Sequence, residues 1–327
     1  MTQFITHTIE PWMPQGALKA KADYATIAVQ ANWQILSLYR YNDSRFDQTT
    51  RVNHINDWLS PVKSDDIVLH QFPTYMSAEF ERDFAIALRQ RGVQSAILIH
   101  DIEPLRLIKK APWEFDVLNQ YDMVIVHSQA MQDALITLGV HTQFIIQNFF
   151  DYLSDYSLPL QFSHKINFAG TFQKSPWLQN YHGPEITVFG SKPKKWRDVT
   201  FPPAINYQGN FNPEDIVHQF QDGFGLIWDS DFDDKTYQSY TKYNTPHKAS
   251  LYLRAGLPLI AWSNSALGKQ IIALNLGFVL DHLDDLADQL NKVDEVQYHI
   301  WQTNALKMTD KLGSGYYTKE TLANITM

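Results

Sequence analysis

The stretch NTPHKASLYLRAGLPLIAW, residues 244–262, decides the fold, because it runs from a polar, basic loop through a helical pattern into a buried strand. Pro246 lies near the first turn, where proline is favoured. The helical pattern stops at Gly256, a typical helix terminator. The apolar run Leu257–Trp262 then has the length and composition of a strand. A helix that passes directly into a buried strand is the unit of a parallel α/β sheet.

The same alternation extends to both sides of this stretch. Helical patterns at Ala78–Arg91 and Ala130–Leu138 each close at a glycine, Gly92 or Gly139. The apolar runs predict strands at Trp33–Tyr39, Ile67–His70, Ser95–His100, Met123–His127 and Phe144–Gln147, and then at Lys165–Ala169, Glu185–Phe189, Gly225–Trp228 and Leu257–Trp262. Strands that are apolar throughout indicate a doubly wound parallel sheet covered on both faces.

The chain length predicts two domains, since 327 residues exceed what one core usually fills. We expect a first domain over residues 1–155 and a second over residues 156–312. The segment 313–327 follows Gly313-Ser314-Gly315, and we expect it to form a helix packed back on the first domain.

The composition excludes several classes of protein. A net charge of −8, with Lys192–Lys195 as the one basic cluster, argues against a protein that binds duplex nucleic acid. The absence of cysteine excludes disulfides, thiolate metal sites and a cysteine nucleophile. No secretory leader or membrane-spanning run is visible, so we expect a cytoplasmic protein.

Three predicted strands of the first domain end in histidine, at His70, His100 and His127. Because ligands bind beyond the carboxyl ends of parallel strands, these residues predict a polar acceptor site. Asp101 and Glu103 are candidates for its general base, and His100 or His127 is a hydrogen-bonding partner.

Two other interpretations of these strand ends stay open. Asp101 and Ser128 also have the residue type and place of helix N-caps, which would make the histidines ordinary strand-end residues. A metal site is a third alternative, although the spacing of the histidines matches no known ligand pattern.

Two glycines mark loops where the backbone can approach a ligand. Gly16 lies in the Pro-rich stretch PWMPQGALKAKAD, which predicts a non-helical loop before a helix from Ala17. Gly170 ends the strand in KINFAGTFQKSPWL, and Thr171 and Lys174 follow it. Lys174 can balance the charge of a phosphate there, or it can be a solvated lysine of an ordinary βα turn.

Lys248 lies in the first turn of the helix within residues 244–262. A cation is unfavourable there, because the helix dipole is positive at its N-terminus. A bound diphosphate would offset the repulsion, so we predict an anion site at this helix start. The alternative is a lysine that extends into water.

These residues resemble a known family. FAGTFQKS, YQGNFNPEDI, FGLIWDSDF, IHDIEPLR and the pattern Asn-x-Pro-His-Lys-x-Ser-x-Tyr-Leu-x-Ala-Gly-x-Pro are similar to bacterial GT-B sugar transferases. The nearest group adds the second sugar, commonly glucose, to O-linked N-acetylglucosamine (GlcNAc) on serine-rich repeat adhesins. Related sequences are galactofuranosyltransferases of surface polysaccharides.

The resemblance implies two Rossmann-like domains facing across a cleft, a C-terminal helix returning to the first domain, a UDP-sugar donor and a homo-oligomer. It implies no metal cofactor, because lysines and backbone amides balance the leaving diphosphate. The Gly16 loop would close over the donor. The implied donor-binding residues of the second domain are Gly170, Thr171, Lys174, Tyr207, Asn244, His247 and Lys248.

The chain departs from the family pattern at two points. Lys174 stands where relatives can carry arginine. Lysine and arginine bind a phosphate with different geometry, so we expect a difference in donor binding. The E-x7-E pair of many retaining enzymes is missing. The stereochemistry therefore stays open: an inverting reaction needs a base such as Asp101 or Glu103, whereas a retaining reaction can use the β-phosphate.

We therefore predict a UDP-sugar-dependent hexosyltransferase of class EC 2.4 that transfers glucose or GlcNAc to a GlcNAc-modified adhesin or similar glycan. The alternatives are an inactive GT-B partner that recognises the acceptor, a galactofuranosyltransferase of capsule or exopolysaccharide synthesis, and a sugar-nucleotide epimerase.

Overall fold

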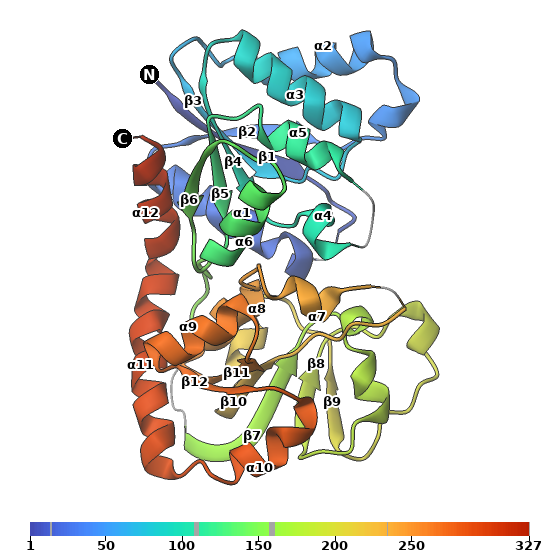
Figure 1. The fold of residues 1–327 in the computed structure, drawn as a ribbon, viewed down its shortest axis with the longest axis vertical. Coiled ribbons are helices and arrows are strands. Elements are labelled where there is room, and N and C mark those ends of the chain that lie inside the picture. The colour runs from blue at the N-terminus through green and yellow to red at the C-terminus, as the bar shows by residue number, and fades with distance from the viewer. Residues whose placement is uncertain (14, 108–110, 157–160, 234, 327) are drawn as a thin grey trace. The chain divides into compact units, whose positions relative to one another are not determined.

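A computed structural model describes residues 1–13, 15–107, 111–156, 161–233 and 235–326. The chain forms two compact units (Figure 1). Unit 1 comprises Met1–Asn148 and Tyr317–Met327, and unit 2 comprises Phe149–Tyr316.

Unit 1 contains a six-stranded parallel sheet in the order β2-β1-β3-β4-β5-β6. Its strands are β1 (Gln3–Ile9), β2 (Gln34–Tyr39), β3 (Ile67–Phe72), β4 (Gln94–Ile99), β5 (Met123–Val126) and β6 (Gln143–Ile146). Its helices are α1 (Gln15–Gln30), α2 (Gln48–Trp58), α3 (Ala78–Gln90), α4 (Glu103–Arg106), α5 (Trp113–Leu118), α6 (Gln129–Thr137) and α12 (Tyr316–Ile325). All described residues of β3 and β5 are buried, as expected for strands covered on both faces.

The C-terminal helix α12 completes unit 1. Gly315 ends the preceding helix with φ +74°, and α12 begins at the next residue. Thr321 donates a hydrogen bond from Oγ1 to Oε1 of Gln147 at 2.6 Å, and Gln94 donates from its side-chain Nε2 to the carbonyl of Ile325 at 3.0 Å. The expected return of the last helix to the first domain is therefore confirmed.

Unit 2 contains a second six-stranded parallel sheet, in the order β12-β11-β10-β7-β8-β9. Its strands are β7 (Gln161–Ala169), β8 (Ile186–Phe189), β9 (Ile205–Gly209), β10 (Asp222–Ile227), β11 (Leu259–Trp262) and β12 (Gly277–Leu280). Its α-helices are α7 (Tyr237–Tyr240), α8 (His247–Arg254), α9 (Ala266–Leu274), α10 (Leu286–Leu290) and α11 (Glu295–Ser314). The core is rich in aromatic side chains, including Phe168, Phe172, Phe224, Trp228 and Tyr298.

The long helix α11 fixes α8 in unit 2. Thr309 donates a hydrogen bond from Oγ1 to the carbonyl of Leu253 at 2.7 Å, and Arg254 donates from Nη1 to the carbonyl of Thr309 at 3.1 Å. Gly313 lies inside α11, where an added β-carbon would lie 2.4 Å from the Arg254 guanidinium carbon. A glycine is therefore needed there for close packing rather than to end the helix.

The predicted strands and helices are present, with ends shifted by a few residues, but the sequence analysis missed β1, β9 and β12. β1 carries polar residues, and one of them, Thr6, is buried, where its Oγ1 accepts a hydrogen bond from the backbone N–H of Gln71 at 2.9 Å. β9 is an edge strand with three exposed residues. β12 follows the apolar helix α9 so closely that the two form one hydrophobic run.

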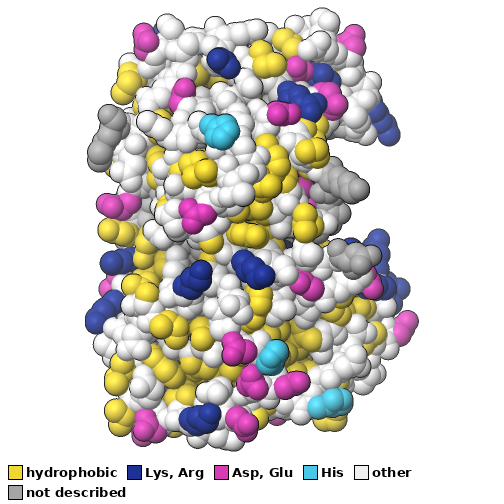
Figure 2. Space-filling model, viewed as in Figure 1, with side chains coloured by type: hydrophobic (Ala, Val, Ile, Leu, Met, Phe, Trp, Pro, Cys, Tyr) yellow, Lys and Arg dark blue, Asp and Glu magenta, His cyan; other side chains and the backbone are white. Residues whose placement is uncertain are grey.

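Acidic and basic side chains are interspersed on the face of the molecule that Figure 2 shows. Across the part of the chain that the structure describes, no helix is both long and apolar enough to cross a bilayer.

Candidate functional site

The strand order of the second sheet marks where a ligand is expected to bind. β7 comes first in this unit, and the later strands add on one side as β8 and β9 and on the other as β10, β11 and β12. In an open parallel sheet, ligands bind beyond the carboxyl ends of the strands at which the order reverses. The candidate site therefore lies after Ala169 of β7 and Ile227 of β10.

Lys248 connects these two strand ends. Its Nζ lies 3.3 Å from Oδ1 of Asp229, which follows β10. A β-carbon added to Gly170, directly after β7, would lie 3.3 Å from the same Nζ. The ammonium also lies 5.1 Å from the centroid of the Phe168 ring. The Lys248 side chain is 23% exposed, so a ligand can reach its charge.

Asp229 supplies a negative charge beside the start of α8. The sequence argument requires an anion near Lys248, and this carboxylate provides one from the chain itself. Lys248 is therefore held by an ion pair and does not simply extend into water. This ion pair holds the ammonium at the strand ends and does not require a bound ligand.

Tyr252 fixes α8 against the sheet. Its side chain is fully buried, and its Oη accepts a hydrogen bond from the N–H of Ala169 at 2.6 Å. The ring occupies the space over Gly225 of β10, where a β-carbon would lie 2.2 Å from Cγ of Tyr252. The position of Lys248 therefore depends on a glycine in a neighbouring strand.

Three glycines form the carboxyl edge of β7, β8 and β9. The N–H of Gly170 donates to the carbonyl of Phe189 at 3.0 Å, and the N–H of Gly190 donates to the carbonyl of Gly209 at 2.7 Å. A β-carbon on Gly190 would lie 1.9 Å from the carbonyl oxygen of Gly170, so only glycine fits. Tyr207 donates from Oη to the carbonyl of Gly190 at 3.0 Å, and the residue is 39% exposed.

Thr171 directly follows Gly170, and Lys174 lies beside the loop that follows β10. Thr171 is exposed, and the Lys174 carbonyl accepts a hydrogen bond from the N–H of Ser230 at 3.0 Å. The Lys174 ammonium lies 5.5 Å from the centroid of the Tyr237 ring. The second predicted lysine is thus next to the segment that carries Asp229.

Asn244 and His247 differ in their surroundings. Oδ1 of Asn244 is buried and has no hydrogen-bond partner among the described residues, so it has capacity for a ligand. His247 is engaged elsewhere: its Nε2 is 2.9 Å from the carbonyl oxygen of Asp151, and its ring stacks on Tyr152 at 4.9 Å. His247 thus anchors the first residue of α8 to the segment that begins unit 2.

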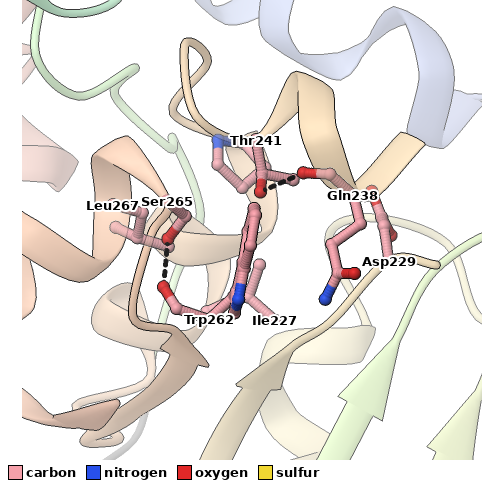
Figure 3. Close-up of a pocket in the computed structure, with 8 residues that line it drawn as sticks. Ile227, Asp229, Gln238, Thr241, Trp262, Ser265 and Leu267 are labelled. Atoms are coloured by element: carbon pink, nitrogen blue, oxygen red, sulfur yellow. Dashed lines mark hydrogen bonds between the residues drawn. The ribbon is translucent and has the colours of Figure 1, made fainter. Parts of the chain in front are cut away.

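A small pocket lies at the carboxyl ends of β10 and β11 (Figure 3). Asp229 and Gln238 line one side of it, and Ser265 and Leu267 line the other. Ser265 is fixed by a 2.7 Å hydrogen bond from Oγ to the carbonyl of Trp262. The pocket extends the candidate donor site toward β11.

In unit 1, Arg106 brings two predicted catalytic carboxylates together. Its Nη1 lies 3.3 Å from Oδ2 of Asp101 and 3.1 Å from Oε1 of Glu103. His100 directly follows β4, and its Nε2 lies 2.9 Å from Oε1 of Gln71. All three predicted residues are therefore clustered after β4.

The helix starts of unit 1 correct two predictions. Gly16 is not in a loop before the helix, because α1 begins at Gln15 and Gly16 is exposed in its first turn. The capping interpretation of Asp101 is wrong, because Ile102 occupies the N-cap of α4. The same interpretation is confirmed for Ser128, whose side chain caps α6.

His70 does not lie at a strand end, because β3 continues to Phe72. It is fully buried, with Nδ1 2.6 Å from Oη of Tyr121 and Nε2 3.5 Å from a carboxylate oxygen of Glu81. Burial lowers the pKa of His70 to about 3 and raises the pKa of Glu81 to about 7. His127 follows β5 as predicted, with its Nε2 2.8 Å from a backbone carbonyl.

Sequence reasoning missed three residues of the candidate donor site: Asp229, Gly190 and Tyr252. Asp229 lies in FGLIWDSDF directly after a predicted strand, so its place beyond a strand end was available from the sequence. The roles of Gly190 and Tyr252 depend on contacts between separate strands and helices, which no local pattern contains.

Comparisons with known proteins agree with this architecture. The glucosyltransferase 3-like N-terminal domain matches residues 2–149, and the glucosyltransferase 3-like C-terminal domain matches residues 166–325. The chain is 28% identical to glucosyltransferase 3 of Streptococcus gordonii, over 95% of this chain and 94% of that protein. It is 23% identical to beta-1,6-galactofuranosyltransferase WbbI of Escherichia coli K12, over 83% and 82% of the two chains.

Solved structures show the same fold at low sequence identity. The E. coli trehalose-6-phosphate structure that is bound with UDP-2-fluoro glucose has a TM-score of 0.66 at 10% identity and covers 99% of each chain. Sucrose-phosphate synthase from Thermosynechococcus elongatus has a TM-score of 0.68 at 10% identity, over 99% of this chain and 98% of that one. The chain therefore has the GT-B fold and belongs to the glucosyltransferase 3-like family of glycosyltransferases.

Proposed function

We propose that this protein transfers a hexose, glucose or GlcNAc, from a UDP-sugar to a GlcNAc-modified serine-rich adhesin or a similar glycan, as a homo-oligomer. The observation that carries the proposal is the Lys248 ammonium, which lies over Gly170 where the strand order of the second sheet reverses. The family and the names of its relatives support sugar transfer. The UDP-2-fluoro glucose in a GT-B structure supports a UDP-sugar donor.

The donor diphosphate would bind beyond β7 and β10. Lys248 and the first N–H groups of α8 would stabilise the negative charge that grows on UDP as the sugar leaves. Lys174 and Thr171 would contact the diphosphate from the β7 side. Asn244 would use its free Oδ1 on a sugar or ribose hydroxyl.

Two further residues would shape the donor site. Tyr207 would contact the nucleotide, because it is partly exposed and held at the glycine edge. His247 would act indirectly, by anchoring α8 through Asp151.

The acceptor would bind on unit 1, near the carboxylates that Arg106 holds. In an inverting reaction, the acceptor oxygen forms a bond to the anomeric carbon and the bond from that carbon to the β-phosphate oxygen breaks. The hydroxyl proton passes to Asp101, whose side chain is 27% exposed. Glu103 shares Arg106 with Asp101, and His100 would orient the acceptor.

A galactofuranosyltransferase of capsule or exopolysaccharide synthesis is the second candidate. The 23% identity to the E. coli galactofuranosyltransferase over most of both chains favours it. This reaction would use the same donor site and would differ from the first candidate in the sugar transferred and in the acceptor.

Titration and product analysis together test these proposals. We would titrate the full chain with UDP, UDP-glucose, UDP-GlcNAc, UDP-galactose and UDP-galactofuranose, with and without EDTA, and then measure UDP release with and without a GlcNAc glycoside. Acceptor-dependent UDP release from UDP-glucose or UDP-GlcNAc supports the first proposal, and release from UDP-galactofuranose supports the second. Donor binding without transfer indicates an inactive partner, and conversion without an acceptor indicates an epimerase. No binding of any nucleotide would overturn the proposal.

A further inference from the structure

The strand order also reverses in the first sheet, between β1 and β3. The carboxyl ends of β1, β2 and β3 are therefore a second position where a ligand is expected. Polar and aromatic side chains gather there from separate loops: Glu10 and Trp12 after β1, Arg40 after β2 and Tyr75 after β3. The residues assigned above to the acceptor follow β4, and the charge of one of them, Asp101, acts on Lys21 and Tyr75, so this group adjoins the same acceptor site.

Glu10 is the buried carboxylate of the group. The residue is 1% exposed, and its Oε1 accepts a hydrogen bond from Nη1 of Arg40 at 2.6 Å. Its Oε2 is buried and has no hydrogen-bond partner among the residues that the structure describes. Leaving a carboxylate oxygen unsatisfied away from water is costly, so Oε2 has capacity for a donor from a ligand.

Two aromatic rings flank Arg40. The guanidinium carbon lies 5.7 Å from the centroid of the Trp12 ring and 5.7 Å from that of Tyr75. Trp12 is 60% exposed and Tyr75 is 40% exposed, so both rings retain open surface. Tyr75 has a φ of +60°, a conformation that is unfavourable for a bulky residue and is found preferentially at functional sites.

The local charges favour a neutral ligand. Lys21 is 4% exposed, donates a hydrogen bond to the carbonyl of Pro73 at 2.5 Å, and has its Nζ 4.7 Å from the centroid of the Tyr75 ring. Glu10, Glu81 and Asp101 together balance the positive charges of Lys21 and Arg40, and the Glu10 carboxylate would repel a phosphate. A pyranose suits the group, because its apolar face stacks on aromatic rings and its hydroxyls donate to a carboxylate.

We propose that Glu10, Trp12, Arg40 and Tyr75 form a binding site for a neutral pyranose on unit 1. Trp12 and Tyr75 contact the ring faces, and Oε2 of Glu10 accepts a hydrogen bond from a sugar hydroxyl. The site binds the acceptor sugar of the transfer reaction, and in this respect it rests on the proposed function. The hydroxyl recognised by Glu10 then sets which acceptor sugars are used.

The test is a titration of the full chain with methyl N-acetyl-β-glucosaminide, in which binding is measured by ligand-observed NMR. The variants are Trp12→Ala and Glu10→Gln, and the matched control is Phe46→Ala, which removes another exposed ring of unit 1 (47% exposed). We expect the first two variants to weaken glycoside binding roughly tenfold or more. Phe46→Ala is expected to bind the glycoside like the wild type, and all variants are expected to bind UDP unchanged.

Equal glycoside binding by the wild type and by folded Trp12→Ala would overturn the proposal, and Trp12 is exposed enough for that variant to fold. Failure of the wild type to bind the glycoside while it binds UDP would also overturn it. If the proposed function is wrong, the same samples will show no UDP binding or no sugar transfer. That result differs from a loss of glycoside binding, so the glycoside titration can still be interpreted.

Discussion

Replacing Lys248 by methionine tests the donor site most directly. Methionine keeps an unbranched apolar stem beside Gly170 and Phe168 but removes the ammonium. In the structure, that ammonium lies 3.3 Å from Asp229. The variant therefore loses one charge at the strand ends, and Asp229 is left without its counter-ion.

The expected effect on UDP binding exceeds the effect on folding. A charge-assisted hydrogen bond to a phosphate contributes about 1.5–3 kcal/mol, which corresponds to roughly a 10- to 150-fold weaker Kd. The unpaired Asp229 carboxylate would add repulsion of the diphosphate. The lost ion pair is only partly buried, so its contribution to stability is about 1 kcal/mol or less.

The chain contains a matched control. Lys165 of β7 pairs with Asp222 of β10 at 3.2 Å, so it joins the same two strands away from their carboxyl ends. We expect Lys165→Met to leave UDP binding unchanged in isothermal titration, and both variants to keep a Tm near that of the wild type. Unchanged UDP affinity in Lys248→Met, or equal losses in both variants, would refute the assignment of Lys248.

Three other predictions address the surrounding structure. Gly190→Ala should destabilise unit 2 by several kcal/mol in urea unfolding, because its β-carbon would lie 1.9 Å from the carbonyl oxygen of Gly170. In the control Gly209→Ala, no atom lies within 4 Å of the added carbon, so the free energy of unfolding should fall by only about 1 kcal/mol. A similar loss of stability in the two variants would contradict the packing argument. Glu81 is buried with a pKa raised to about 7, so its contribution to stability is fully present below about pH 4.5 and is lost as the pH rises through 7. Glu81→Gln should therefore raise stability relative to the wild type at pH 8, by up to about 3 kcal/mol, and by much less at pH 5; an equal difference in Tm at both pH values would contradict this. Asp101→Asn should lower kcat strongly while the Kd for UDP stays unchanged, and unchanged turnover would remove Asp101 as the base.

Local patterns were sufficient for much of the fold. The helix that begins at His247 and stops before Gly256 could be predicted because capping and terminating residues act within one or two turns. The buried strands β3, β4 and β5 could be predicted because strands covered on both faces are continuously apolar. β1 could not, because Thr6 is polar and its burial depends on a hydrogen bond to Gln71 of another strand.

For the candidate sites too, some features follow from short-range sequence and others depend on tertiary packing. The places of Lys248, Gly170 and Lys174 in the fold could be predicted, because each lies near a strand end or a helix start, which short-range sequence defines. His247 was predicted beside the donor, and its contact with Asp151 could not be predicted, because the direction of a side chain at a helix start depends on what packs against it.

The sequence by itself determined most of the buried strands, several of the helices between them, the glycines that end those helices, and the lysine at the start of α8. Only the tertiary structure decided that Asp229 neutralises Lys248, that Gly190 packs on Gly170, and that Arg40 pairs with Glu10 and lies near two aromatic rings. The physical reason is the range of the interactions. Periodicity and capping act between residues near in the chain, whereas strand order brings together side chains from distant segments through packing and charge.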